Sequence, residues 1–196
     1  MIATNVRPAN ATLVYSLNLL HNRRAFWLLQ IPATISALIF AVFFLWWTIR
    51  LRPGVFPLIS KGIIVTLPGL FFLILGSVVS IILHELVHGF FFWIYSHSRP
   101  RFGFRGGYAY AAAPGWFFPR NQYLVIALAP LVLLSIVGMV LVAIVPVGAI
   151  YAILFGLVAN AAGAVGDMWI AFKVVRERRK IVVEDLGDGM NFYALS

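Results

Sequence analysis

Four long apolar runs alternate with short polar connections along this chain. They cover residues 25–48, 67–95, 123–145 and 148–172. Each run is long enough for a helix that crosses the hydrocarbon core, which takes about 20 mainly apolar residues. The short break at residues 145–148 makes the last two helices antiparallel neighbours. The pattern therefore predicts an all-α membrane protein with about four transmembrane helices.

The connection between the second and third runs has a different pattern. Residues 101–105 and 108–111 alternate in side-chain type around Gly106-Gly107. Such alternation around a two-residue turn predicts a short β-hairpin-like loop. Two roles stay open for it, a strand edge that pairs with a peptide and an aromatic anchor at the membrane surface.

The flanks are predicted to be short. Residues 1–24 form an N-terminal cytoplasmic or interfacial segment, residues 25–172 a single membrane domain, and residues 173–196 a basic cytoplasmic tail. Within the first segment, residues 13–20 fit an interfacial helix and a loosely ordered leader equally well. The end of the tail, residues 181–196, is expected to be solvated, and the alternative is that it covers the cytoplasmic mouth of a site in the membrane domain. The first 24 residues lack a basic region followed directly by an apolar stretch and a small-residue cleavage site, so a removable signal peptide is not expected.

The amino-acid composition also indicates a membrane protein. Hydrophobic residues make up 62% of the chain and charged residues only 11%, which is too apolar for a soluble domain. The 15 Lys and Arg residues lie between the apolar runs, so they favour a lipid bilayer and not a nucleic acid as the partner. With both termini cytoplasmic, 12 of these basic residues lie inside and 3 outside, and this bias predicts that topology for a multi-pass integral membrane protein.

Two of the six acidic residues stand apart from the others. Glu85 and Asp167 are the only acids in the first 176 residues, and both lie inside predicted spans. A carboxylate at that depth is costly and indicates a functional site. Because the chain has no Cys, any metal is held by His, Asp or Glu.

Glu85 belongs to an H-E-x-x-H motif that runs from His84 to His88. On a helix this spacing places both imidazoles on one face, where they fill two corners of a zinc site. Glu85, next to the first ligand, is then placed to take a proton from metal-bound water. The alternative to a metal site is a hydrogen-bonded polar patch that holds helices together.

A catalytic zinc usually has three protein ligands. Asp167 is the predicted third ligand, and His97 is its rival; the alternative for Asp167 is an ion pair with Lys173 or Arg176. Asn160 lies two helical turns before Asp167, and either a hydrogen bond to the substrate or oxyanion or helix packing fits its position. A run of small residues separates the two, which allows a close helix neighbour.

These motifs resemble the site-two protease type of intramembrane zinc metalloprotease, and more closely the zincin membrane peptidases grouped with it. The similarity runs from His84 to Asp167 and includes the hairpin loop, a helix beginning Leu128-Ala129-Pro130 and a helix bearing Asn160 and Gly166-Asp167. The resemblance implies Zn²⁺ held by His84, His88 and Asp167, Glu85 as the activator of water, and a substrate strand paired to the hairpin edge. Unlike better-known members, this chain has no Pro between Asn160 and Asp167, and its Gly precedes the Asp.

The sequence therefore predicts a zinc-dependent endopeptidase that hydrolyses membrane-protein or peptide substrates in or near the membrane. Two alternatives use the same polar cluster. One is a catalytically inactive membrane adaptor, which would not need Glu85. The other is a metal-binding or ion-transport protein, although the chain shows no inverted repeat.

Overall fold

The computed structural model describes residues 2–18, 23–55, 67–105, 108–187 and 189–195, and its helices and strands fall into two compact units. Unit 1 consists of Met1–Gln30, Glu85–Ala129 and Gly166–Ser196, and unit 2 of Ile31–His84 and Pro130–Val165. Three helices pass from one unit into the other, namely α1 (Arg23–Leu51), α3 (Leu67–Ser96) and α4 (Arg120–Ile144).

Unit 2 is helical. It holds parts of α1, α3 and α4, a short 3₁₀ turn η1 (Pro53–Val55), and α5 (Val147–Gly163). Helices α3 and α5 meet through small residues: a Cβ added to Gly76 would lie 2.0 Å from the carbonyl oxygen of Ala152. One turn further along both helices, the Ser80 hydroxyl donates to the Gly156 carbonyl at 2.7 Å. Because both numbers rise together, α3 and α5 run parallel, as the predicted topology requires of spans two and four.

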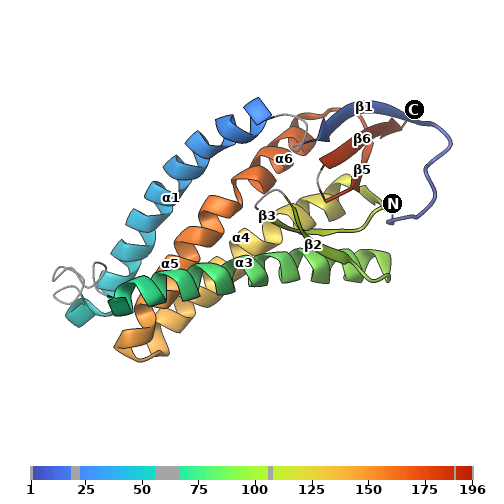
Figure 1. Cartoon of the computed structure of the whole chain (residues 1–196). Coiled ribbons are helices and arrows are strands. Elements are labelled where there is room, and N and C mark those ends of the chain that lie inside the picture. The colour runs from blue at the N-terminus through green and yellow to red at the C-terminus, as the bar shows by residue number, and fades with distance from the viewer. Residues whose placement is uncertain (1, 19–22, 56–66, 106–107, 188, 196) are drawn as a thin grey trace. The chain divides into compact units, whose positions relative to one another are not determined.

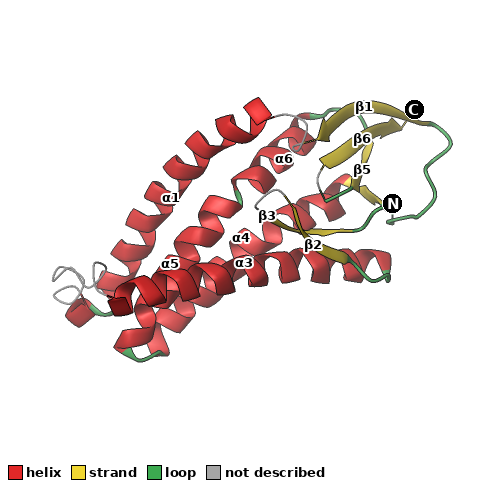
Figure 2. Ribbon diagram, in the orientation of Figure 1, coloured by secondary structure: helices red, strands yellow, loops and turns green. Residues whose placement is uncertain are grey.

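Unit 1 contains all of the strands (Figure 2). Strands β1 (Ala11–Asn18), β4 (Phe117–Pro119), β5 (Ile181–Asp185) and β6 (Gly189–Leu195) form an antiparallel sheet in the order β1-β6-β5-β4. The sheet joins the two ends of the chain, since Ala11 of β1 is the register partner of Leu195 of β6 (Figure 1).

The second sheet is the predicted hairpin. Strands β2 (Arg101–Arg105) and β3 (Tyr108–Ala112) pair antiparallel, with Gly103 opposite Tyr110. The prediction of two short strands at this place is confirmed, while the Gly106-Gly107 turn itself lies outside the described residues.

The core of unit 1 lies between the helices and the larger sheet. Phe92 of α3, Ile126 of α4 and Val174 of α6 (Val165–Arg176) pack in one buried cluster with Val183 of β5 and Phe192 of β6. The C-terminal strands are thus part of the core, with Val183 fully buried.

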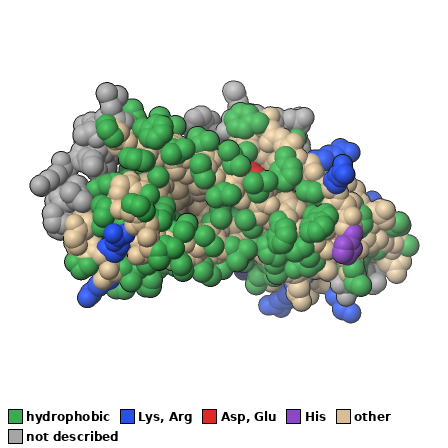
Figure 3. Space-filling model, turned by 90° about the horizontal axis from the view of Figure 1, so that it is seen from below, with side chains coloured by type: hydrophobic (Ala, Val, Ile, Leu, Met, Phe, Trp, Pro, Cys, Tyr) green, Lys and Arg blue, Asp and Glu red, His purple; other side chains and the backbone are tan. Residues whose placement is uncertain are grey.

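Three of the described helices are long and apolar enough to cross a membrane, and the pair α5 and α6, bent by 41°, makes a fourth if it counts as one span. Apolar side chains cover much of the face drawn in Figure 3. On α1, the side chains of Ile31, Leu38 and Val42 are each more than 60% exposed. Such surface is compatible with lipid as the solvent.

The expectation of an all-α fold needs correction, because the structure has two antiparallel sheets. Residues 11–18 form a strand and neither an interfacial helix nor a loose leader. Residues 181–185 and 189–195 form β5 and β6 where a solvated end was expected. The physical reason is that the β-branched residues of β5 are buried on both faces of the sheet. Ile181 and Val183 pack against the helices, and Val182 packs with Ala11 of β1 and Tyr193 of β6.

Candidate metal centre

The first two candidate ligands lie on one face of α3, in the part of the helix that is long and apolar enough to cross a membrane, Pro68–Ser96. His84 and His88 are separated by one helical turn. Both are buried, with 7% and 8% of their surface exposed. Buried imidazoles in an apolar helix need polar partners, because unpaired polar groups are costly there.

The third candidate ligand comes from the first turn of α6. The Nε2 atom of His88 lies 3.5 Å from Oδ2 of Asp167. His84, His88 and Asp167 each offer one ligand atom, and these atoms all lie within 4.8 Å of one another. Two imidazole nitrogens and one carboxylate oxygen form the donor set of a hydrolytic zinc site with one position left for water.

His84 is oriented by Asn160. Its Nδ1 atom lies 2.9 Å from Oδ1 of Asn160, and the amide nitrogen of Asn160 donates to the carbonyl oxygen of Pro130 at 3.3 Å. Since a carbonyl only accepts, the second contact fixes which end of the amide faces His84. Nδ1 of His84 therefore carries the proton, and Nε2 keeps the lone pair that a metal requires.

His88 is oriented by a backbone group. Its Nδ1 atom lies 2.9 Å from the carbonyl oxygen of Ile126 on α4. Inside a helix that carbonyl would normally accept from the amide four residues later, but residue 130 is a proline without an N–H. Pro130 thus leaves the carbonyl of Ile126 available, and His88 also presents Nε2 for ligation.

The residues therefore fit a bound zinc ion. Both histidines have their Nδ1 protons engaged by acceptors, which is how metal-ligating histidines are usually held. The carboxylate of Asp167 supplies the negative charge that a divalent cation offsets.

Glu85 directly follows His84 on α3 and is half-buried. Its position is about 100° around the helix from His84 and about 60° from His88, so it lies to one side of the line that joins the two histidines. That offset is compatible with a base beside the metal position.

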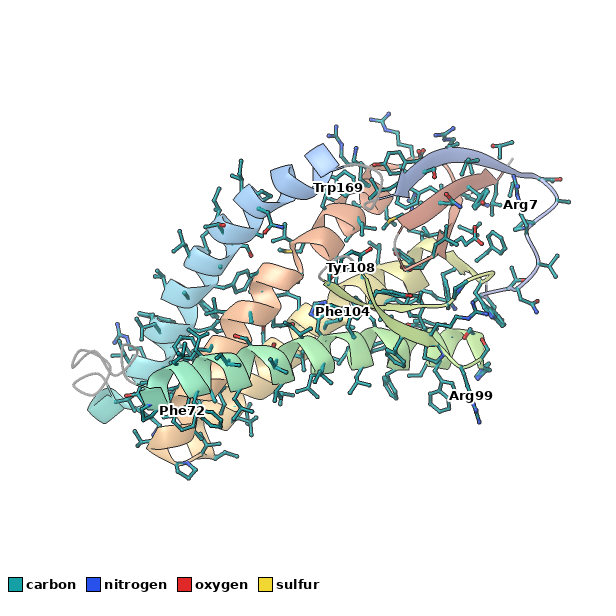
Figure 4. All side chains as sticks on the ribbon, viewed as in Figure 1. Arg7, Phe72, Arg99, Phe104, Tyr108 and Trp169 are labelled. Carbon is teal, nitrogen blue, oxygen red and sulfur yellow. The ribbon has the colours of Figure 1, made fainter. Side chains whose placement is uncertain are left out.

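Two of the other sequence candidates lie outside the cluster. His97, the rival third ligand, ends α3 in a left-handed conformation with φ of 53°, and it does not belong to the metal-compatible cluster found among the described residues. Lys173, a proposed ion-pair partner of Asp167, has its ammonium group over the rings of Tyr15 and Trp169, 5.5 and 5.3 Å from their centroids; Trp169 is labelled in Figure 4. Asn160 contacts His84 and the carbonyl of Pro130. These contacts indicate that Asn160 orients a candidate ligand, a role that was not among those expected from sequence.

Sequence reasoning missed a third carboxylate near the cluster. Asp185, at the end of β5, accepts a hydrogen bond from the hydroxyl of Tyr123 at 2.7 Å. Burial raises the pKa of Asp185 to about 6, while the bond from Tyr123 lowers it; His88 also lowers it and Asp167 raises it. Tyr123 lies one turn before Ile126 on α4, so Asp185 contacts the helix that also orients His88. The signal that could have found it is the apolar, β-branched run directly before it.

The fold and the site together define a class, a helical protein whose H-E-x-x-H helix and a second helix bring two histidines and an aspartate into one metal-compatible cluster. Residues 77–182, more than half of the chain, match a family described as "Putative zincin peptidase", and the chain belongs to that family. A search of curated proteins and a search of solved structures each found no match.

Proposed function

We propose that this protein is a zinc-dependent intramembrane endopeptidase. The observation that carries the proposal is the cluster of His84, His88 and Asp167, in which both histidines have Nδ1 engaged by an acceptor on another helix. A purely structural polar patch would not need this common orientation. Family membership as a zincin peptidase supports the same activity.

Zinc held by these three residues would supply Lewis acidity, which polarises the scissile carbonyl and lowers the pKa of a coordinated water. Glu85 takes the proton of the attacking water on its carboxylate and delivers it to the nitrogen of the leaving amine. Asn160 and the carbonyl of Ile126 hold the imidazole rings in place during these steps. The residues of α3 on both sides of the motif are apolar, which disfavours bulk water beside it.

The decisive experiment uses the variant Glu85→Gln in purified protein. We expect it to keep its zinc, measured by atomic emission, and to lose at least about 10²–10⁴-fold in cleavage of a transmembrane peptide, the range typical of lost proton transfer. Loss of zinc from a folded Glu85→Gln protein would show that Glu85 is a ligand. Equal cleavage by the variant and the wild type would refute the mechanism.

The hairpin is proposed to receive the substrate as an added strand. It is docked directly beside the motif, because a Cβ on Gly89, the residue after His88, would lie 2.3 Å from the ring of Phe102 on β2. Phe104 and Tyr108, labelled in Figure 4, flank the turn, and Phe104 is 75% exposed.

Gly89→Val tests this role. The larger side chain pushes Phe102 and β2 away from α3, so we expect normal zinc content with cleavage reduced on the order of 10²-fold, the loss that a misplacement of about 1 Å can cause. Gly148→Ala is the matched control, because its Cβ would meet nothing within 4 Å. Normal cleavage by Gly89→Val would remove the hairpin from the mechanism.

The proposed topology places both termini in the cytoplasm. Its support is the excess of basic residues in the flanks and in the hairpin connection. The parallel run of α3 and α5 agrees with it, since spans two and four must then cross in the same direction.

A further inference from the structure

Asp185 stands out because its surroundings are unusual for a carboxylate in this protein. The chain carries 15 Lys and Arg residues and only 6 acidic ones. Within the described ranges, the contacts of Asp185 are the hydroxyl of Tyr123 on Oδ2 at 2.7 Å and the amide of Gly187 on Oδ1 at 2.9 Å, both neutral donors. Glu177, by contrast, has an ion pair with Arg179 at 2.8 Å.

The position of Asp185 is fixed relative to the metal cluster through α4. Tyr123 is 3% exposed, and it lies one helical turn before Ile126, whose carbonyl oxygen binds His88. Residues three apart share a helix face. One face of α4 therefore contacts both Asp185 and His88.

The turn after Asp185 is also fixed against the hairpin. Gly187 has φ of +84°, and a Cβ there would lie 2.5 Å from the ring of Tyr110 on β3. The same ring covers Gly103 on β2, where a Cβ would be 2.5 Å away. The loop that carries Asp185 thus abuts the two strands that are proposed to bind the substrate (Figure 2).

We propose that Asp185, held by Tyr123, forms a subsite that selects substrates carrying a Lys or Arg side chain next to the scissile bond. The proposal rests on the proposed peptidase function. A half-buried carboxylate with neutral donors as neighbours binds a cation more strongly than a solvated one does. Transmembrane substrates offer that cation, because Lys and Arg are concentrated in their cytoplasmic flanks.

The test uses detergent-solubilised transmembrane peptides that are identical except at one flanking position, which carries Lys, norleucine or Glu and is moved along the flank. Cleavage by wild-type zinc protein gives kcat/KM, and binding to the non-cleaving Glu85→Gln protein gives Kd. We expect one position at which Lys is preferred over norleucine by about tenfold or more in both measurements, the gain of a charge-assisted contact.

Asp185→Asn, which keeps the shape of the side chain, should abolish this preference and leave the norleucine peptide unaffected. Asp185→Lys should favour the Glu peptide. Glu184→Gln is the matched control: Glu184 is the neighbouring acid on β5 and bonds to Asn191 and Tyr193 of β6, so its variant should keep the wild-type preference.

Two results would overturn the subsite. One is equal cleavage of Lys and norleucine peptides by the wild type at every position, which leaves the peptidase function intact. The other is an equal loss for all three peptides in Asp185→Asn, which indicates a structural role. Failure of the peptidase function looks different, because no peptide is cut while the Asp185-dependent preference for Lys persists in the binding measurement.

Discussion

Replacing Asn160 by Ala tests how the metal cluster is built. Asn160 is 2% exposed, and its Oδ1 is the acceptor for Nδ1 of His84. The variant leaves a buried N–H without its acceptor, at a cost of about 1–3 kcal/mol. That energy corresponds to a change of roughly 5- to 150-fold in an equilibrium constant. Loss of an orienting partner typically weakens metal affinity by about 10–100-fold. We therefore expect zinc affinity to fall by about one to two orders of magnitude.

The assay is competition for zinc between the purified protein and a chromophoric chelator of known affinity. Ser80→Ala is the matched control, because Ser80 lies one turn before His84 and makes its own α3–α5 hydrogen bond at 2.7 Å. That variant should retain zinc affinity to within about twofold, whereas Asn160→Asp, which keeps an acceptor, should bind zinc at least as tightly as the wild type. The reasoning is refuted if Asn160→Ala binds zinc normally but loses cleavage, since Asn160 would then act on the substrate or oxyanion.

Two further predictions concern the third ligand and the topology. Asp167→Ala should lose zinc and cleavage while His97→Ala keeps both, measured by metal content and peptide turnover; the reverse pattern would make His97 the ligand. A Cys introduced at Arg99, which is exposed at the start of the hairpin connection, should react with an impermeant thiol reagent from the cytoplasmic side, and one at Gly54 from the other side. Reaction of both from the same side would contradict the four-span topology.

The elements that were predictable from sequence are those defined by local pattern. The second apolar run was expected at residues 67–95, and α3 spans Leu67–Ser96. The hairpin strands likewise follow from alternation around two glycines. Hydrophobic length and alternation are short-range signals, so a single stretch of sequence carries them completely.

The larger sheet was not predictable in the same way. Strand β1 pairs with β6 at the far end of the chain, and the partner of Ala11 is Leu195. Neither segment contains a local sequence feature that identifies the other as its pairing partner. Strand β5 was further concealed because it follows the basic stretch 173–180, which by itself indicates a solvated tail. The burial of Val183 depends on helices, and that of Val182 on strand β1, which the tail meets only in the folded chain.

The candidate ligands could be identified by residue type, but their orientation could not. Asp167 stood out because ionisable residues are rare in spans. Nothing in the sequence alone states that Asn160 contacts His84, although both lie in predicted helices of parallel direction. That contact needs the close approach of α3 and α5, which Gly76 and Gly156 permit.

The structure supplies a physical reason for Pro130 within an apolar helix. His84 and His88 are four residues apart on α3, and each needs an acceptor for its Nδ1 proton. His88 contacts the carbonyl oxygen of Ile126 directly, and His84 is linked to the carbonyl oxygen of Pro130 through Asn160. Ile126 and Pro130 are also four residues apart, on α4. In an unbroken helix the carbonyl of Ile126 would be occupied by the amide of residue 130. A proline at that position removes the competing donor, so Pro130 and the spacing of the H-E-x-x-H motif form parts of one arrangement.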